Sequence, residues 1–184
     1  IMEGYVTMAS EAAEQLREMA INRPTHVFVQ AGVGSLAGAV VGYFTNLYPD
    51  NPPTFVVVEC APAACLYKGA AAGDGLCCGE PNILGWDILR NHATAFVSCP
   101  DWVTARGMRT LGAPEKGDPR VISGESGAVT TGLVETLMLD PEYAELKELI
   151  GLDKTSSVLC FSTEGDTDPD QYRRIVWEGE YPTC

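Results

Sequence analysis

The chain has 184 residues, of which 46% are hydrophobic and 20% charged, and its net charge is −13. This length and composition are typical of a globular protein with a core of its own. The negative charge argues against nucleic-acid binding, which needs clustered Lys and Arg. No apolar run approaches the ~20 residues that cross a bilayer, so we expect neither a nucleic-acid nor a membrane partner.

Apolar periodicity predicts strands and helices that alternate along the chain. Strands are expected at 26–30, 54–60, 95–99 and 158–161. Helices are expected at 8–22, 35–47, 61–68, 86–91, 102–111, 124–139 and 141–150. The apolar run TFVVVEC is typical of a parallel strand that is covered on both faces. The pattern predicts a three-layer α/β fold with a mainly parallel sheet and helices on both faces.

A glycine turn, QAGVGSLA, joins the strand at 26–30 to the following helix. Glycines let a backbone approach a phosphate closely, a helix N-terminus attracts anions, and Ser35 adds a hydroxyl donor. Gly32, Gly34 and Ala37 also match the dinucleotide fingerprint, and Glu59 lies 25 residues after Gly34. The turn therefore predicts a phosphate ligand and, by itself, leaves a Rossmann-type dinucleotide site open.

The seven cysteines show no CxxC pair, which argues against a zinc ribbon or a thioredoxin site. Cys65 and Cys78 flank a glycine-rich stretch, where a disulfide is conceivable although such bonds are uncommon in reducing compartments. Asp166 and Asp168 are interpreted as a solvated turn, and no spacing indicates a metal site. Trp177 is interpreted as a packing residue.

Four segments, in this order, resemble the diaminopropionate ammonia-lyases, which are fold type II pyridoxal-phosphate enzymes. They are THVFVQAGVGSLAG, CGEPNILGWDILRN, ISGESGAV and FSTEGDTD. The resemblance covers nearly the whole chain, and the second and fourth segments are specific to that family. It favours pyridoxal 5′-phosphate over a dinucleotide.

The resemblance also implies roles for individual residues. The loop that holds the cofactor phosphate would be Gly32, Val33, Gly34, Ser35 and Leu36. Ser162, with Thr163 beside it, would face the pyridine nitrogen. Glu125 would lie near the ring, although a charge that simply favours a helix N-terminus is the alternative interpretation.

Two departures from the family lead us to expect a partial chain. None of the four lysines, Lys68, Lys116, Lys147 and Lys154, stands in the context of the family's Schiff-base lysine, which is expected in a missing N-terminal half. We therefore expect no catalytic residue within 1–184, which would be one cofactor-binding domain from the C-terminal portion of a longer enzyme. We also expect residues to be missing between Gly75 and Leu76, where family members carry a glycine-rich segment.

The resemblance implies a lyase that degrades 2,3-diaminopropionate to pyruvate and ammonia, works in the cytoplasm and is usually a homodimer. This chain would hold the cofactor phosphate and the pyridine nitrogen, and it would be inactive alone. The alternatives are a related serine or threonine dehydratase and a Rossmann-type dinucleotide-binding domain with Glu59 on the ribose.

Overall fold

A computed structural model describes residues 2–61, 64–72 and 82–182. The chain divides into two compact units, and each is treated by itself. Unit 1 comprises Ile1–Ser98 and Leu152–Leu159, and unit 2 comprises Cys99–Gly151 and Cys160–Cys184. Among the described residues, no helix is both long and apolar enough to cross a membrane.

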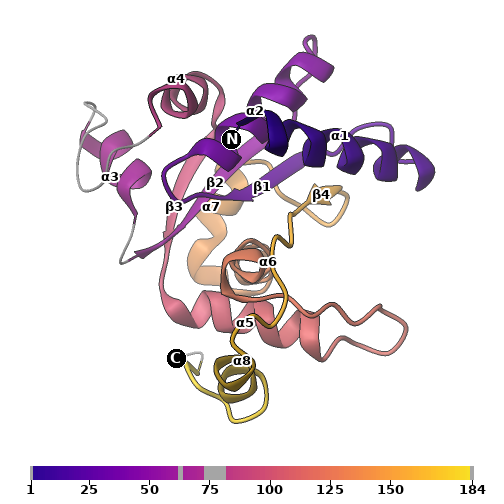
Figure 1. The fold of residues 1–184 in the computed structure, drawn as a ribbon, viewed down its shortest axis with the longest axis vertical. Helices are drawn as coiled ribbons and strands as arrows, with labels where there is room; N and C mark the ends of the chain where they lie inside the picture. The colour runs from indigo at the N-terminus through magenta and orange to yellow at the C-terminus, as the bar shows by residue number, and fades with distance from the viewer. Residues whose placement is uncertain (1, 62–63, 73–81, 183–184) are drawn as a thin grey trace. The chain divides into compact units, whose positions relative to one another are not determined.

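Unit 1 is built on a sheet with the strand order β3-β2-β1-β4 (Figure 1). The strands are β1 (His26–Gln30), β2 (Thr54–Cys60), β3 (Ala95–Cys99) and β4 (Val158–Leu159). β1 pairs in parallel with both β2 and β4, which confirms the predicted mainly parallel sheet. All five residues of β1 are buried, as expected for a strand with covered faces. The first three strands have the predicted bounds, whereas β4 is two residues shorter.

The helices of unit 1 are α1 (Met2–Glu18), α2 (Ser35–Leu47), α3 (Cys65–Ala72) and α4 (Ile83–His92). α2 packs on both α1 and α4 (Figure 1). α1 begins earlier than predicted and ends before residue 22, because Ala20 adopts a left-handed conformation with φ 60°. The Ile21 amide then donates to the Leu16 carbonyl at 2.8 Å, which closes the helix end.

Two helix starts in unit 1 differ from prediction because side chains cap them. α3 begins at Cys65 rather than at 61, because the Glu59 carboxylate accepts from amides in the first turn of this helix. α4 begins at Ile83 rather than at 86, because the Asn82 side chain accepts from the Gly85 amide at 2.9 Å. Both are side-chain acceptors for otherwise unpaired N–H groups.

Unit 2 is helical. It contains α5 (Asp101–Gly112), α6 (Glu125–Leu139), the 3-10 turn η2 (Pro141–Tyr143), α7 (Ala144–Leu149) and α8 (Pro169–Val176). The predicted helix at 141–150 is divided into η2 and α7. α8 was not predicted, although Asp168 caps it by accepting from the Gln171 amide at 3.0 Å and Pro169 stands at its first turn. Trp177, which follows α8, is 69% exposed, so its interpretation as a packing residue is wrong.

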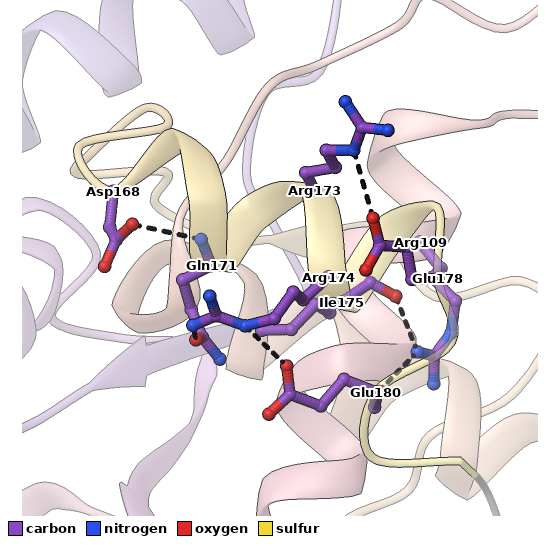
Figure 2. A network of polar contacts seen from close by, with 8 residues as sticks. All are labelled: Arg109, Asp168, Gln171, Arg173, Arg174, Ile175, Glu178 and Glu180. Carbon is purple, nitrogen blue, oxygen red and sulfur yellow. Dashed lines mark hydrogen bonds and ion pairs between the residues drawn. The ribbon is translucent and has the colours of Figure 1, made fainter.

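Arg109 of α5 holds the C-terminal end of α8 and the chain that follows it (Figure 2). Its guanidinium donates at 3.1 Å to the carbonyls of Ile175, Glu180 and Tyr181. A guanidinium matches this task because its several donors have a fixed geometry and the last carbonyls of a helix lack partners. Around it, Arg174 pairs with Glu180 at 3.0 Å on the surface.

We expect Arg109→Ala to lower the free energy of unfolding of unit 2 by about 2 kcal/mol, because three carbonyls lose a charged donor. Urea denaturation followed by circular dichroism measures the change. Arg174→Ala is the matched control, since its exposed ion pair should contribute at most about 1 kcal/mol. Equal losses for the two variants would contradict the role given to Arg109.

Candidate cofactor-binding site

The predicted phosphate loop lies in unit 1, between β1 and the first turn of α2. Val33 is 52% exposed there. The described part of the chain supplies no hydrogen-bond partner to the backbone amides of residues 32–36. Such amides lie at the positive end of the helix dipole and are open donors for an anion. The fold thus brings together the five residues predicted for this loop, which are Gly32, Val33, Gly34, Ser35 and Leu36.

Gly34 is required by its backbone conformation. Its φ is 92°, in the left-handed region that side chains rarely adopt. A Cβ there would also lie 3.4 Å from methyl groups of Leu66 and Leu89. At Gly32, by contrast, a Cβ would meet nothing within 4 Å, so the space beside the loop is open.

The carbonyls of the loop are held by residues that sequence reasoning did not assign to the site. The Asn82 amide donates to the Val33 carbonyl at 2.8 Å, and Cys65 Sγ lies 3.5 Å from the Gly32 carbonyl oxygen. Asn82 belongs to the family-specific CGEPN segment, which was the only available signal. Whether Cys65 pairs with Cys78 stays a prediction, because Cys78 lies outside the described residues.

Glu59 does not have the surroundings of a ribose-binding carboxylate. It is 1% exposed, and its two oxygens accept from the amides of Leu66 at 3.0 Å and Tyr67 at 2.6 Å. The carboxylate is therefore used to cap α3, and the dinucleotide interpretation of the glycine turn loses its acidic residue.

In unit 2, Ser162 lies beside the N-terminal end of α6. Its hydroxyl donates to Ser123 Oγ at 2.9 Å, and Ser123 in turn lies 3.3 Å from the Gly124 carbonyl. Ser123 is buried, whereas Ser162 and Thr163 are exposed. Gly127 makes this arrangement possible, since a Cβ there would lie 2.5 Å from Ser123 Oγ. Ser162 is thus oriented by a buried partner that sequence reasoning missed.

Glu125 is the first residue of α6 and stands among other acidic residues of unit 2. Burial raises its pKa above the ordinary value, and the charges of Glu164 and Asp168 raise it further. The Glu164 carboxylate meanwhile accepts from the Ser126 amide at 2.8 Å and so caps α6. A cavity of about 30 Å³ is lined by these acidic residues, which is room for a water molecule rather than an amino acid.

Glu125→Gln tests this electrostatic environment. Because the folded pKa lies above the unfolded one, the carboxylate lowers stability increasingly as pH rises through the folded pKa, and it has no such effect below the ordinary value of 4.5. We expect the variant to be more stable than the wild type by about 0.5 kcal/mol at pH 8, since solvent screens an exposed group. The gain should vanish near pH 4. Thermal denaturation across this range measures it, and a gain independent of pH would contradict the assignment.

The described residues contain no group of three or more His, Cys, Asp or Glu that could hold a metal ion. The loop at 32–36 belongs to unit 1, and Glu125, Ser162 and Thr163 belong to unit 2.

An α/β fold with an open glycine turn before a helix is typical of phosphate-bearing cofactors. The family of pyridoxal-phosphate dependent enzymes matches residues 1–147, and the chain belongs to this family.

Within that family, the chain is similar to diaminopropionate ammonia-lyases. That of Escherichia coli K12 is 49% identical over 194 aligned residues, which cover 98% of this chain and 48% of the relative. That of Salmonella typhimurium is 46% identical, with 97% and 48% covered. The chain thus spans about half the length of the curated relatives it matches.

Solved structures give the same result. The crystal structure of selenomethionine-incorporated holo diaminopropionate ammonia lyase from E. coli matches with a TM-score of 0.92 and 50% identity, over 100% of this chain and 48% of that chain. The processed form of threonine deaminase isoform 2 from Solanum lycopersicum matches with a TM-score of 0.73 at 16% identity, and it shares the fold alone.

Proposed function

We propose that this chain is the part of a diaminopropionate ammonia-lyase that holds the phosphate and the pyridine nitrogen of pyridoxal 5′-phosphate. The observation that carries the proposal is the open set of amides at residues 32–36. The similarity to diaminopropionate ammonia-lyases along 98% of the chain supports the choice of cofactor and substrate. Residues 1–184 would be one cofactor-binding domain from the C-terminal portion of a longer enzyme.

The loop fits a phosphate dianion by its donors and by its space. Gly32 has no neighbour on the side where a Cβ would lie, so a phosphate oxygen can approach the backbone. The amides of residues 32–36 and the Ser35 hydroxyl would donate to the phosphate oxygens. The dipole of α2 adds a favourable field for the two negative charges.

From the family resemblance, Ser162 of unit 2 would face the pyridine nitrogen. Its hydroxyl donates to the buried Ser123 Oγ at 2.9 Å, and this rotatable O–H would turn toward the ring nitrogen to donate to it. A hydroxyl does not protonate this nitrogen as a carboxylic acid would, which suits elimination at the β-carbon. Thr163 lies next to this position, and Glu125 would contribute a carboxyl group whose pKa is raised.

The reaction would convert 2,3-diaminopropionate and water to pyruvate and two molecules of ammonia. Pyridoxal phosphate supplies the electron sink that makes loss of the α-proton and of the β-amino group possible. The lysine that removes the proton would come from outside this chain, because its four lysines, all described, are not buried. The chain alone is therefore expected to bind the cofactor without turning over substrate.

Fragment complementation tests the proposal. The chain would be co-expressed with the N-terminal half of the E. coli enzyme. The 2-oxo acid product would then be assayed, which is pyruvate from 2,3-diaminopropionate or serine and 2-oxobutyrate from threonine. Pyruvate formation from diaminopropionate that requires both halves is the expected result. Turnover of the hydroxy amino acids alone would favour the related dehydratase instead.

The same proposal includes residues missing after Gly75, a homodimeric state and a cytoplasmic location. The alignment of 194 residues is longer than the 184-residue chain, so the relatives carry residues that it lacks, and we place these after Gly75. The family resemblance supports a homodimer. The acidic composition and the scattered spacing of the cysteines, without a CxxC pair, are typical of a cytoplasmic enzyme. The intact mass of the natural protein and its size by light scattering would check the first two points.

A further inference from the structure

The N-terminal end of α4 lies against the phosphate loop through two backbone contacts. The Asn82 amide donates to the Val33 carbonyl at 2.8 Å. At Gly85, a Cβ would lie only 2.6 Å from the Gly34 carbonyl oxygen and 3.0 Å from its carbon. The Asn82 side chain accepts from the Gly85 amide at 2.9 Å, so the two contacts belong to one capped turn.

These contacts fix the directions of two amides in the loop. In a trans peptide, the carbonyl and the following N–H group point to opposite sides, and no described peptide is cis. Holding the Val33 carbonyl toward Asn82 therefore turns the Gly34 N–H away from α4. The Gly34 carbonyl accepts from the Gly38 amide at 2.8 Å and abuts Gly85. Because this carbonyl is fixed, the Ser35 N–H of the same peptide is directed to the opposite side.

We propose that Asn82 and Gly85 are positioning residues that set the Gly34 and Ser35 amides in place for a phosphate monoester. The inference rests on the proposed function, since it assigns a role toward the phosphate held by that loop. Donors that are ordered before the ligand arrives lose less conformational entropy on binding, and this raises affinity. Asn82, the last residue of the CGEPN segment, thereby acquires a role in cofactor binding without touching the cofactor.

Only glycine fits at this contact between α2 and α4. A Cβ on Gly38 would lie 2.7 Å from the Gly85 Cα, so both backbones approach each other without side chains. Gly42, one turn further along α2, provides a matched control in the same interface. A Cβ there would lie 3.5 Å from Ile88 Cδ1, which is ordinary van der Waals contact.

The experiment compares the wild-type chain with Gly85→Ala, Asn82→Ala and Gly42→Ala. Each is titrated with pyridoxal 5′-phosphate and with pyridoxal, which lacks the phosphate, by isothermal calorimetry. We expect Gly85→Ala to weaken binding of the phosphorylated compound at least tenfold and Asn82→Ala to weaken it severalfold. Binding of pyridoxal should not change, and Gly42→Ala should match the wild type with both compounds.

Circular dichroism establishes that each variant is folded. If Gly85→Ala and Asn82→Ala are folded and bind pyridoxal phosphate as tightly as the wild type, the positioning role is overturned. If Gly85→Ala does not fold, Asn82→Ala decides by the same criterion. A wild-type chain that binds both compounds equally would instead overturn the proposed function, and the inference with it.

Discussion

Gly132→Ala is expected to destabilise unit 2 strongly. A Cβ at Gly132 of α6 would lie 1.9 Å from the Val103 carbonyl oxygen of α5. The neighbour is backbone rather than a flexible side chain, so the helices must separate. Overpacking of this kind costs at least about 3 kcal/mol, a large fraction of a typical domain's stability. Urea denaturation followed by circular dichroism measures the loss.

Gly165→Ala is the control for this prediction, because a Cβ there meets nothing within 4 Å. Its stability should remain within about 0.5 kcal/mol of the wild type. Gly107 faces the same contact, with a Cβ only 2.0 Å from the Ala128 carbonyl oxygen, so its alanine variant should resemble that of Gly132. A Gly132→Ala chain as stable as the wild type would contradict this helix packing.

Ser35→Asp is expected to raise the Kd for pyridoxal phosphate at least about 100-fold. The new carboxylate would lie beside the phosphate dianion, where like charges at ~4 Å repel by about 4 kcal/mol in a partly buried site. Folding should be unimpaired, because an acidic residue is favourable at a helix N-terminus. Binding and stability therefore change in different directions, and titration with the cofactor, together with thermal denaturation, separates them.

Two variants control this prediction. Ser35→Ala loses one hydroxyl donor and should weaken binding by less than about tenfold. Asn46→Asp adds the same charge near the other end of α2, where the side chain is exposed, and should leave the affinity unchanged. Equal affinities for Ser35→Asp and Ser35→Ala would place the phosphate elsewhere.

Local sequence patterns predicted most of the sheet and the loop. β1, β2 and β3 are short β-rich or apolar runs between turn signals, so their bounds follow from composition alone. The turn at 32–34 was found because it stands between such a strand and an apolar helix. The start of α3 could not be found in this way, since it depends on Glu59, whose position at the end of β2 also suits a ribose ligand.

The supporting residues of the site depend on contacts between distant segments. Asn82 bonds to a carbonyl 49 residues earlier, and Ser123 bonds to a hydroxyl 39 residues later. No local pattern reports such pairs. α8 is different, because Asp168 and Pro169 are ordinary helix-start signals. The interpretation of Asp168 as part of a solvated turn missed its capping of α8.

The amides of residues 32–36 are proposed to bind the cofactor phosphate. The most direct test is a ¹H–¹⁵N correlation spectrum of the chain, recorded during titration with pyridoxal 5′-phosphate. The amide protons of this loop are expected to show the largest shifts to lower field, because they form hydrogen bonds to the phosphate. Two results would contradict phosphate binding by this loop. In one, other amide signals shift to saturation with pyridoxal phosphate while those of residues 32–36 do not change; in the other, the loop signals respond to NAD but not to pyridoxal phosphate.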